Sequence, residues 1–200
     1  MRWFLALLLA LVSFPAMAAP PANLDEIVSS LRKGGCVLFM RHTHTHSDQK
    51  DTDLKNLDNI KAQRQLTENG RLQARALGIS FRKLGIPVGK IVASRLQRAL
   101  DTARLLALCE VEPSDSVTLE EDKPERRKKA EVLLGLLSSP PPAGENTIIV
   151  SHLQNLMDCQ GNAFITLEEG GVVVFKPLSN GTLTTVGVIE SPLPWIKLAR

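Results

Sequence analysis

Three short apolar segments of this sequence each lead directly to arginine or histidine. They are residues 35–40 before Arg41 and His42, residues 91–94 before Arg95 and Arg98, and residues 147–151 before His152. Continuous apolar runs of this length are typical of strands buried on both faces of a parallel sheet. The carboxyl ends of such strands meet at one edge, where α/β sheets bind small ligands. We therefore expect two imidazoles and two or three guanidiniums at one rim, the groups needed to hold and transfer a phosphoryl group.

The first residues of the chain have the pattern of an export signal. Met1-Arg2 precedes an almost wholly apolar run, residues 3–12, and Ala16-Met17-Ala18 follows. A charged start, a short apolar stretch and an Ala-x-Ala site are the three parts of a secretory signal peptide. The run is shorter than the roughly 20 residues that a membrane-spanning helix needs. We therefore expect cleavage after Ala18, a periplasmic or secreted mature protein and no stable membrane insertion.

The remaining chain, residues 19–200, is expected to form one domain, because this length with 44% hydrophobic residues can bury one substantial core. Strand-like runs alternate with segments of helical period, and a further short strand is expected at 117–119. Asn180-Gly181 joins two strand-like segments, 171–178 and 182–190, and predicts a hairpin. The pattern predicts an α/β three-layer sandwich: a mostly parallel central sheet, helices on both faces and a C-terminal antiparallel hairpin at the edge.

Charge argues against nucleic acid and membrane surfaces as partners. The formal net charge is +3, and removal of the leader takes one arginine and no acidic residue. Such a weak excess does not provide the basic patch that nucleic acids or anionic membranes require. The dense basic run Arg126-Arg127-Lys128-Lys129 lies on an expected helix, where a solvated face explains it.

The three cysteines, Cys36, Cys109 and Cys159, leave at least one thiol unpaired. Cys36 lies within an apolar run and is expected to be buried. Cys109 and Cys159 are the one pair considered for a disulfide. No Cys-x-x-Cys spacing indicates a redox motif or a cysteine zinc site.

Four blocks in this order resemble the histidine phosphatase superfamily, the phosphoglycerate-mutase-like fold. They are Arg41-His42, the segment Leu66-Thr67-Glu68-Asn69-Gly70-Arg71, Ser94 with Arg98-Ala99-Leu100-Asp101-Thr102-Ala103, and Ser151-His152. The chain is most similar to a small exported branch of bacterial type. It departs from the usual pattern at Thr43, where the family generally has glycine. A β-carbon there could narrow the approach of phosphate to the backbone.

The resemblance implies an exported, metal-independent phosphomonoesterase without a cofactor that acts on a phosphorylated small molecule or another phosphoester. His42 is the expected nucleophile, because a neutral imidazole can form a covalent phosphohistidine. Arg41 and Arg98 are expected to bind phosphate oxygens through their planar forks. His152 is expected to contact a phosphate oxygen and to position the nucleophile.

The acid that protonates the leaving group is less clear from the sequence. Glu120 occupies roughly the place where many members of the family keep this acid, and Asp48, in the long polar segment after His42, is the alternative. Thr43, Arg95, Arg64 and Asn155 are candidates for substrate contacts. The polar segment 43–65 is expected to set substrate choice, since a connection this long is usually functional.

Two other classes of function stay open at this point. His42, His44 and His46 alternate, and with His152 they could ligate zinc or copper, which would sequester the nucleophile. The other alternative is a catalytically weak protein that binds a phosphorylated ligand, suggested by Thr43 and the uncertain acid.

Overall fold

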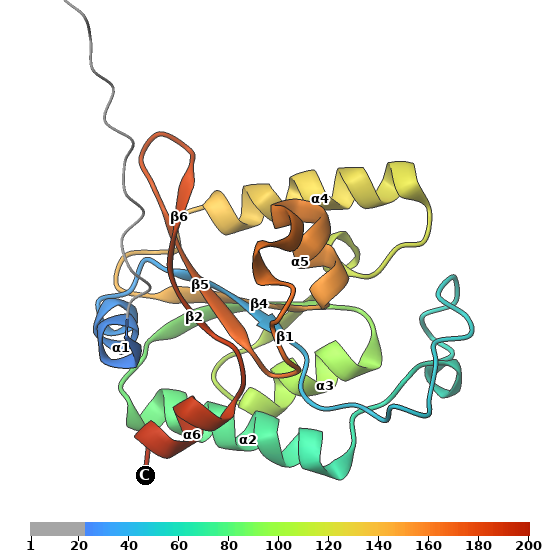
Figure 1. Ribbon diagram of the computed structural model, residues 1–200, viewed down its shortest axis with the longest axis horizontal. Coiled ribbons are helices and arrows are strands. Elements are labelled where there is room, and N and C mark those ends of the chain that lie inside the picture. The colour runs from blue at the N-terminus through green and yellow to red at the C-terminus, as the bar shows by residue number, and fades with distance from the viewer. Residues whose placement is uncertain (1–22) are drawn as a thin grey trace, which may run out of the picture.

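The computed structural model describes residues 23–200, which contain a six-stranded sheet with the strand order β3-β2-β4-β1-β5-β6 (Figure 1). The strands are β1 (Val37–Arg41), β2 (Val88–Ser94), β3 (Val111–Ser114), β4 (Asn146–Ser151), β5 (Val172–Pro177) and β6 (Leu183–Ile189). β3, β2, β4 and β1 run parallel, and β5 pairs antiparallel with both β1 and β6. The predicted mostly parallel sheet with a C-terminal hairpin at its edge is confirmed.

Helices cover both faces of the sheet. They are α1 (Leu24–Arg32), α2 (Glu68–Lys83), α3 (Gln97–Leu106), α4 (Lys123–Ser138), α5 (Leu153–Gln160) and α6 (Leu193–Leu198). α1, α2, α3 and α6 share one buried apolar cluster with the sheet, and α4 and α5 share another on the opposite face. Figure 1 shows α4 and α5 on one side of the strands and α2, α3 and α6 on the other. No helix among the described residues is long and apolar enough to cross a membrane.

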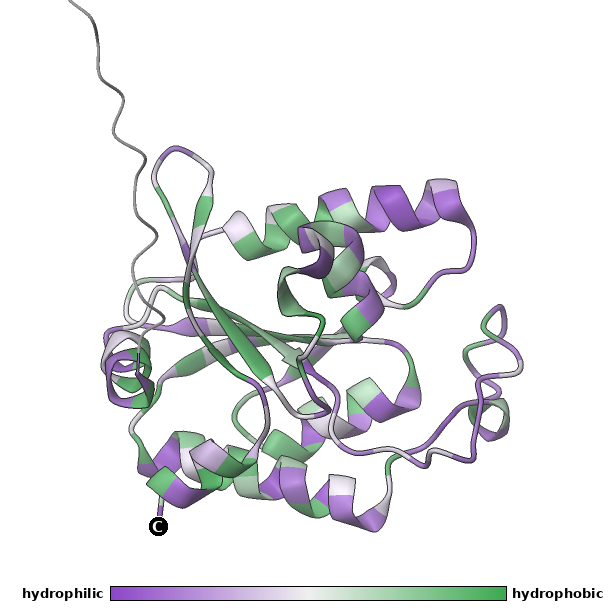
Figure 2. Ribbon diagram, viewed as in Figure 1, coloured by the Kyte–Doolittle hydropathy of each residue, from purple (hydrophilic) through white to green (hydrophobic). Residues whose placement is uncertain are grey.

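The apolar runs follow from burial on both faces. In β1, Leu38 and Met40 pack into the first cluster, whereas Val37 and Phe39 pack into the second. Successive side chains of a strand point to opposite faces, so a strand covered on both sides has no polar alternation. Figure 2 shows the central strands as continuously hydrophobic and the outer faces of the helices as mixed.

Two helix starts follow the sequence signals closely. Asn23 caps α1 in a capping box with Glu26, because each side chain accepts a hydrogen bond from the other residue's backbone N–H. The Thr67 hydroxyl accepts from the Gly70 N–H at the start of α2, 3.0 Å away.

The structure corrects the position of one expected strand, shows a helix in the C-terminal tail, and leaves the considered cysteine pair unbonded. The strand expected at 117–119 lies instead at Val111–Ser114, and Asp115–Val117 forms a turn of 3-10 helix. The C-terminal tail contains the short helix α6, whose Trp195 is fully buried beside Phe81. Cys109 and Cys159 are both free, because Cys109 packs on the first face of the sheet and Cys159 on the second. The expected signal peptide, residues 1–18, lies outside the described residues.

Candidate active site

The parallel strands β2, β4 and β1 bring their polar ends to one rim. β1 ends at Arg41, which is in register with Ser151 at the end of β4. His42 and His152 follow these two strand ends directly, and their ring centroids are 5.3 Å apart. β2 ends at Ser94, shortly before α3 presents Arg98. The structure thus places Arg41, His42, Arg98 and His152 together, as expected from the order of strands and helices.

His42 is held in a defined tautomer. Its ring is buried, and its Nδ1 lies 3.0 Å from the backbone oxygen of Thr43. A carbonyl oxygen only accepts, so Nδ1 donates the proton and Nε2 carries the lone pair. Burial, followed by the positive charge of Arg98, lowers the pKa of His42 well below its ordinary value. The imidazole is therefore neutral at neutral pH, with Nε2 ready to act as a nucleophile.

His152 lies beside it in a similar environment. Its Nε2 is 2.8 Å from the Ser94 hydroxyl, whose oxygen also accepts from the Leu96 N–H. Burial, and then Arg98 and His42, lower the pKa of His152 well below its ordinary value. Its second ring nitrogen, Nδ1, is buried and has no hydrogen-bond partner within residues 23–200.

Two arginines complete the cluster with unsatisfied donors. Arg41 donates from Nη1 to the Leu167 backbone oxygen, 2.8 Å away, and Arg98 donates from Nη1 to Asp51 Oδ1, also at 2.8 Å. The Nε atoms of both arginines are buried without a partner among the described residues. Buried polar groups in folded proteins almost always have partners. Three such atoms around one imidazole indicate a site for an anion with several oxygens.

A sequence model of the histidine phosphatase superfamily (branch 1) matches residues 37–125. This segment carries Arg41, His42 and Arg98. Over this segment, which is a little under half of its 200 residues, the chain is similar to the histidine phosphatase superfamily. The resemblance drawn from the sequence blocks is thereby confirmed. No curated protein sequence matches the chain significantly.

Solved structures agree with this similarity at the level of the fold. The protein histidine phosphatase SixA complexed with tungstate is 16% identical, with a TM-score of 0.55 over 80% of this chain and 98% of its own. A phosphoserine phosphatase from Entamoeba histolytica is 17% identical, with a TM-score of 0.55 over 76% and 95%. A mycobacterial glucosyl-3-phosphoglycerate phosphatase is 16% identical, with a TM-score of 0.53 over 79% and 99%. At these identities the similarity establishes the shared architecture.

Glu169 also lies at this site, although the sequence patterns did not single it out. Its Oε1 lies 3.8 Å from Arg41 Nη2, 3.9 Å from Arg64 Nη2 and 3.9 Å from His42 Nδ1. The hydroxyl of Thr45 donates to the same oxygen, and the Thr45 N–H donates to Oε2. A signal did exist: the predicted hairpin starts just after Glu169, and an antiparallel strand beside β1 begins at the rim where β1 ends.

Among the candidate substrate contacts, Arg64 reaches the cluster through Glu169, 3.9 Å away. Asn155 is buried and donates to the Thr118 backbone oxygen, 3.4 Å away, while its own side-chain oxygen has no partner. Arg95 is half exposed and pairs with Asp115 at 3.2 Å. Thr43 is fully buried, and its hydroxyl is hydrogen-bonded to the hydroxyl of Thr102 in α3. The Thr43 side chain therefore packs against α3.

Neither of the acids suggested by the sequence contacts the histidine pair. Glu120 lies 3.4 Å from Lys129 Nζ, and hydrogen bonds from the Asp122 and Glu121 backbones lower its pKa, which disfavours a proton donor. The side chain of Asp48 is 83% exposed and lies beside His46. Their role as the acid stays a prediction that this geometry does not favour.

The four histidines do not converge on a common point. His44 Nδ1 lies 2.9 Å from the Thr67 hydroxyl at the start of α2, and His46 faces Asp48. Within residues 23–200, no group of three or more His, Cys, Asp or Glu side chains is placed to hold a metal ion. The geometry of the described residues therefore gives the metal-binding alternative no support.

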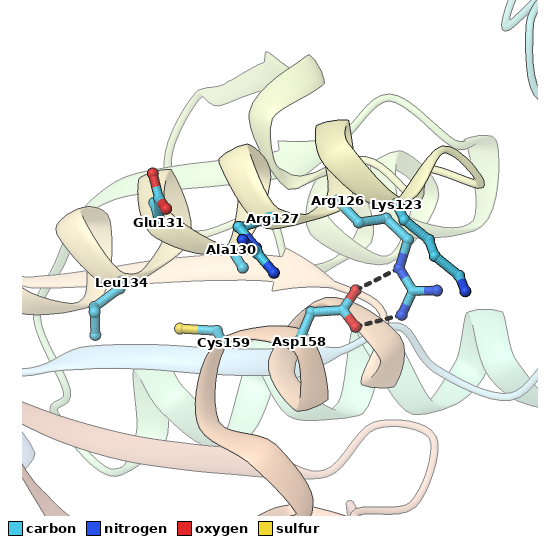
Figure 3. Close-up of a pocket in the computed structure, with 8 residues that line it drawn as sticks. All are labelled: Lys123, Arg126, Arg127, Ala130, Glu131, Leu134, Asp158 and Cys159. Atoms are coloured by element: carbon cyan, nitrogen blue, oxygen red, sulfur yellow. Dashed lines mark hydrogen bonds and ion pairs between the residues drawn. The ribbon is translucent and has the colours of Figure 1, made fainter.

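A separate hollow of about 400 Å³ lies between α4 and α5 (Figure 3). Arg126 and Asp158 form a bidentate ion pair at one end of this hollow. Cys159 and Leu134 lie at the other end. None of the four residues gathered at the strand ends lines it.

Proposed function

We propose that this protein is a phosphatase that hydrolyses phosphomonoesters through a phosphohistidine on His42. The observation that carries the proposal is the set of three buried, unpartnered polar atoms around that imidazole: Nε of Arg41, Nε of Arg98 and Nδ1 of His152. A phosphoryl group has three equatorial oxygens, and donors in these positions would bind them. The match of residues 37–125 to the histidine phosphatase superfamily supports the same chemistry.

In this mechanism one residue attacks phosphorus, and two arginines stabilise the charge that develops. His42 Nε2 attacks phosphorus, and the bond to the ester oxygen breaks. Arg41 and Arg98 stabilise the charge that spreads over the transferring group, in a site where burial strengthens electrostatic interactions. Water then attacks the phosphohistidine, which returns His42 to its neutral form. We propose that this scheme uses no metal ion or cofactor, because the guanidiniums supply the positive charge.

We propose that the substrate is a small phosphomonoester that the protein binds after its own export. Proteins of the same fold include a phosphoserine phosphatase, solved in complex with phosphoserine, and a glucosyl-3-phosphoglycerate phosphatase. The polar segment 43–65 covers the rim and carries Arg64, so it is placed to choose among leaving groups. Export by a leader cleaved after Ala18 remains part of the proposal, and the N-terminal sequence of the protein secreted from cells would test it.

A panel of phosphate esters, offered to residues 19–200, tests the proposed activity. We expect the wild type to release phosphate in the presence of a chelator and to form an acid-labile phosphoryl adduct on rapid quenching. His42→Ala should lose both. His46→Ala is the matched control, because His46 lies half exposed beside Asp48 and should keep full activity.

Three results would contradict the proposal. Chelator-sensitive activity, or loss of activity in His46→Ala, would favour a metal site. Binding of a phosphate ester without any release of phosphate would select the catalytically weak binding protein instead.

A further inference from the structure

Two carboxylates touch the cluster of arginines and histidines, and neither is a residue that the sequence analysis named as the acid. They are Asp51, from the polar segment, and Glu169, from the turn before β5. The inference drawn from them rests on the proposed phosphatase activity. It concerns the proton that the leaving alcohol must receive.

Asp51 covers Arg98 from the solvent side. Its Oδ1 accepts hydrogen bonds from Arg98 Nη1 at 2.8 Å and from the Arg64 backbone N–H at 2.9 Å. The side chain of Arg98 is 1% exposed, whereas that of Asp51 is 16% exposed. The carboxyl group is therefore partly open to solvent, whereas the guanidinium that it binds is buried.

The hydrogen bonds of Arg98 place this carboxyl group next to the expected phosphate. Nη1 is used by Asp51, while Nε is buried and unpartnered. A guanidinium is planar and small, so a phosphate bound along the edge formed by Nε and Nη2 and a carboxylate bound at Nη1 are held by the same group. Asp51 would then lie within reach of the ester that Arg98 holds.

The direction of attack leads to the same side. In phosphoryl transfer the attacking and leaving atoms are roughly in line with phosphorus. His42 lies at the buried end, with 2% exposure. We infer that the leaving oxygen, opposite Nε2, points away from this buried ring and toward the partly exposed Asp51.

Glu169 is placed for a different task. It approaches His42 from the Nδ1 side, whereas the phosphoryl group binds at Nε2. Both of its oxygens are already engaged by Thr45. A donor to the leaving group has to face the opposite side of the imidazole.

We propose that Asp51 is the catalytic acid that protonates the leaving alcohol and the base that later activates water. A phosphomonoester bound as its monoanion carries one proton, which the Asp51 carboxylate takes as the dianion pairs with Arg41 and Arg98. His42 Nε2 forms a bond to phosphorus, the P–O bond to the alcohol breaks, and the alcohol oxygen takes the proton from Asp51. In the second step Asp51 takes a proton from water, the water oxygen bonds to phosphorus, and the N–P electron pair returns to His42.

Leaving-group dependence tests this assignment. Asp51→Asn keeps an oxygen that can accept from Arg98 and Arg64, so the site should retain its shape. For alkyl phosphates, whose leaving groups need a proton, we expect kcat/KM to fall by at least about 100-fold. For p-nitrophenyl phosphate, whose leaving group is a weak base, we expect a fall of less than about threefold in the first step.

Matched variants separate this role from a structural one. Asp58→Asn changes an almost fully exposed aspartate of the same segment and should leave both substrates unaffected. An equal loss of kcat/KM toward both substrates in Asp51→Asn, or no loss toward either, would overturn the assignment. The same selective loss in Asp48→Asn instead would move the role to Asp48. If the wild type hydrolyses neither substrate, the proposed function fails, which is a different result from any of these.

Discussion

The neutral state of His42 depends on its burial and on the arginine beside it. Desolvation is the largest cause of its lowered pKa, and the charge of Arg98 is the second. Both disfavour the imidazolium, so the nucleophile keeps its lone pair at pH values where an exposed histidine would be protonated. The same surroundings that bind phosphate thus prepare the nucleophile.

Replacing Arg98 by glutamine should raise the pKa of His42. The positive charge disappears while burial remains, so the titration midpoint should move up but stay below the ordinary histidine value. NMR of ring-labelled histidine, recorded from pH 8 downward, measures the midpoint directly. An unchanged or lower midpoint would show that Arg98 does not act on His42 through its charge.

Glu169→Gln should slow the formation of phosphohistidine. The imidazole gains positive charge when Nε2 attacks, and a carboxylate 3.9 Å from Nδ1 stabilises that charge. We expect kcat to fall by about 10- to 100-fold for alkyl and aryl phosphates alike, unlike the selective loss in Asp51→Asn. Glu168→Gln changes the exposed neighbour and serves as the control. An equal effect in both variants would exclude a specific role for Glu169.

Thr43→Gly should reduce stability more than activity. The Thr43 hydroxyl is buried against Thr102, and the part of Thr43 that touches His42 is its backbone oxygen. Loss of the buried hydrogen bond and the gain in unfolded-state freedom should cost about 1–3 kcal/mol of unfolding free energy. Urea unfolding measures this cost, and kcat should stay within about threefold. A large rise in kcat would show that the Thr43 side chain does obstruct the phosphate.

At the scale of elements, the start of α2 fixes the segment that follows His42. Thr67 caps the helix and also contacts His44, and Gly70 lies so close to the chain that an added β-carbon would be 2.0 Å from the His44 backbone oxygen. The first turn of α2 therefore packs directly on the backbone that leaves the active site.

Substitutions at these two positions should differ in severity. Thr67→Ala removes one cap and should cost about 1 kcal/mol of unfolding free energy. Gly70→Ala forces a clash with backbone, which cannot move aside as a side chain can, so it should cost more and also lower kcat. Chemical unfolding together with phosphatase assays would measure both. Equal costs would contradict the close packing of the helix on residue 44.

The elements that could be predicted are those whose burial produces a recognisable apolar run in the sequence. The runs of β1, β2 and β4 are apolar because both faces are covered, and each carries its functional residue in the same stretch of sequence. β3 was misplaced because it is an edge strand with Glu112 and Pro113 at exposed positions, whereas the buried apolar Val117 lies in a 3-10 turn. A partly exposed strand of four residues leaves no such pattern.

The residues of the site also fall into two groups, those that the sequence predicts and those that only the folded chain reveals. Arg41, His42, Arg98 and His152 lie at element ends, so topology alone brings them together. Asp51 and Glu169 reach the site through contacts with Arg98 and Thr45, which are distant in sequence. Neither residue lies in a segment with apolar periodicity, so only the folded chain shows that they face the cluster.

For the whole molecule, the active site makes stability depend on pH. His42 and His152 are both buried at the end of a sheet that is itself covered on two faces, and the pKa of each is lowered well below its ordinary value. The unfolded chain returns both imidazoles to water, where they bind protons below about pH 6.5. Over that range the unfolded state holds more protons than the folded state, so acid favours unfolding.

The expected result is a loss of unfolding free energy as the pH falls below about 6.5, at a rate approaching about 1.4 kcal/mol per pH unit for each histidine. The loss should continue down to the lowered pKa of the folded protein and be absent above about pH 7.5. Urea unfolding at pH 8, 6.5 and 5 measures it in the wild type and in a double variant, His42→Asn with His152→Asn. The double variant should lose much less stability between pH 6.5 and 5. Parallel curves for the two proteins would show that the histidines are not held neutral by the fold.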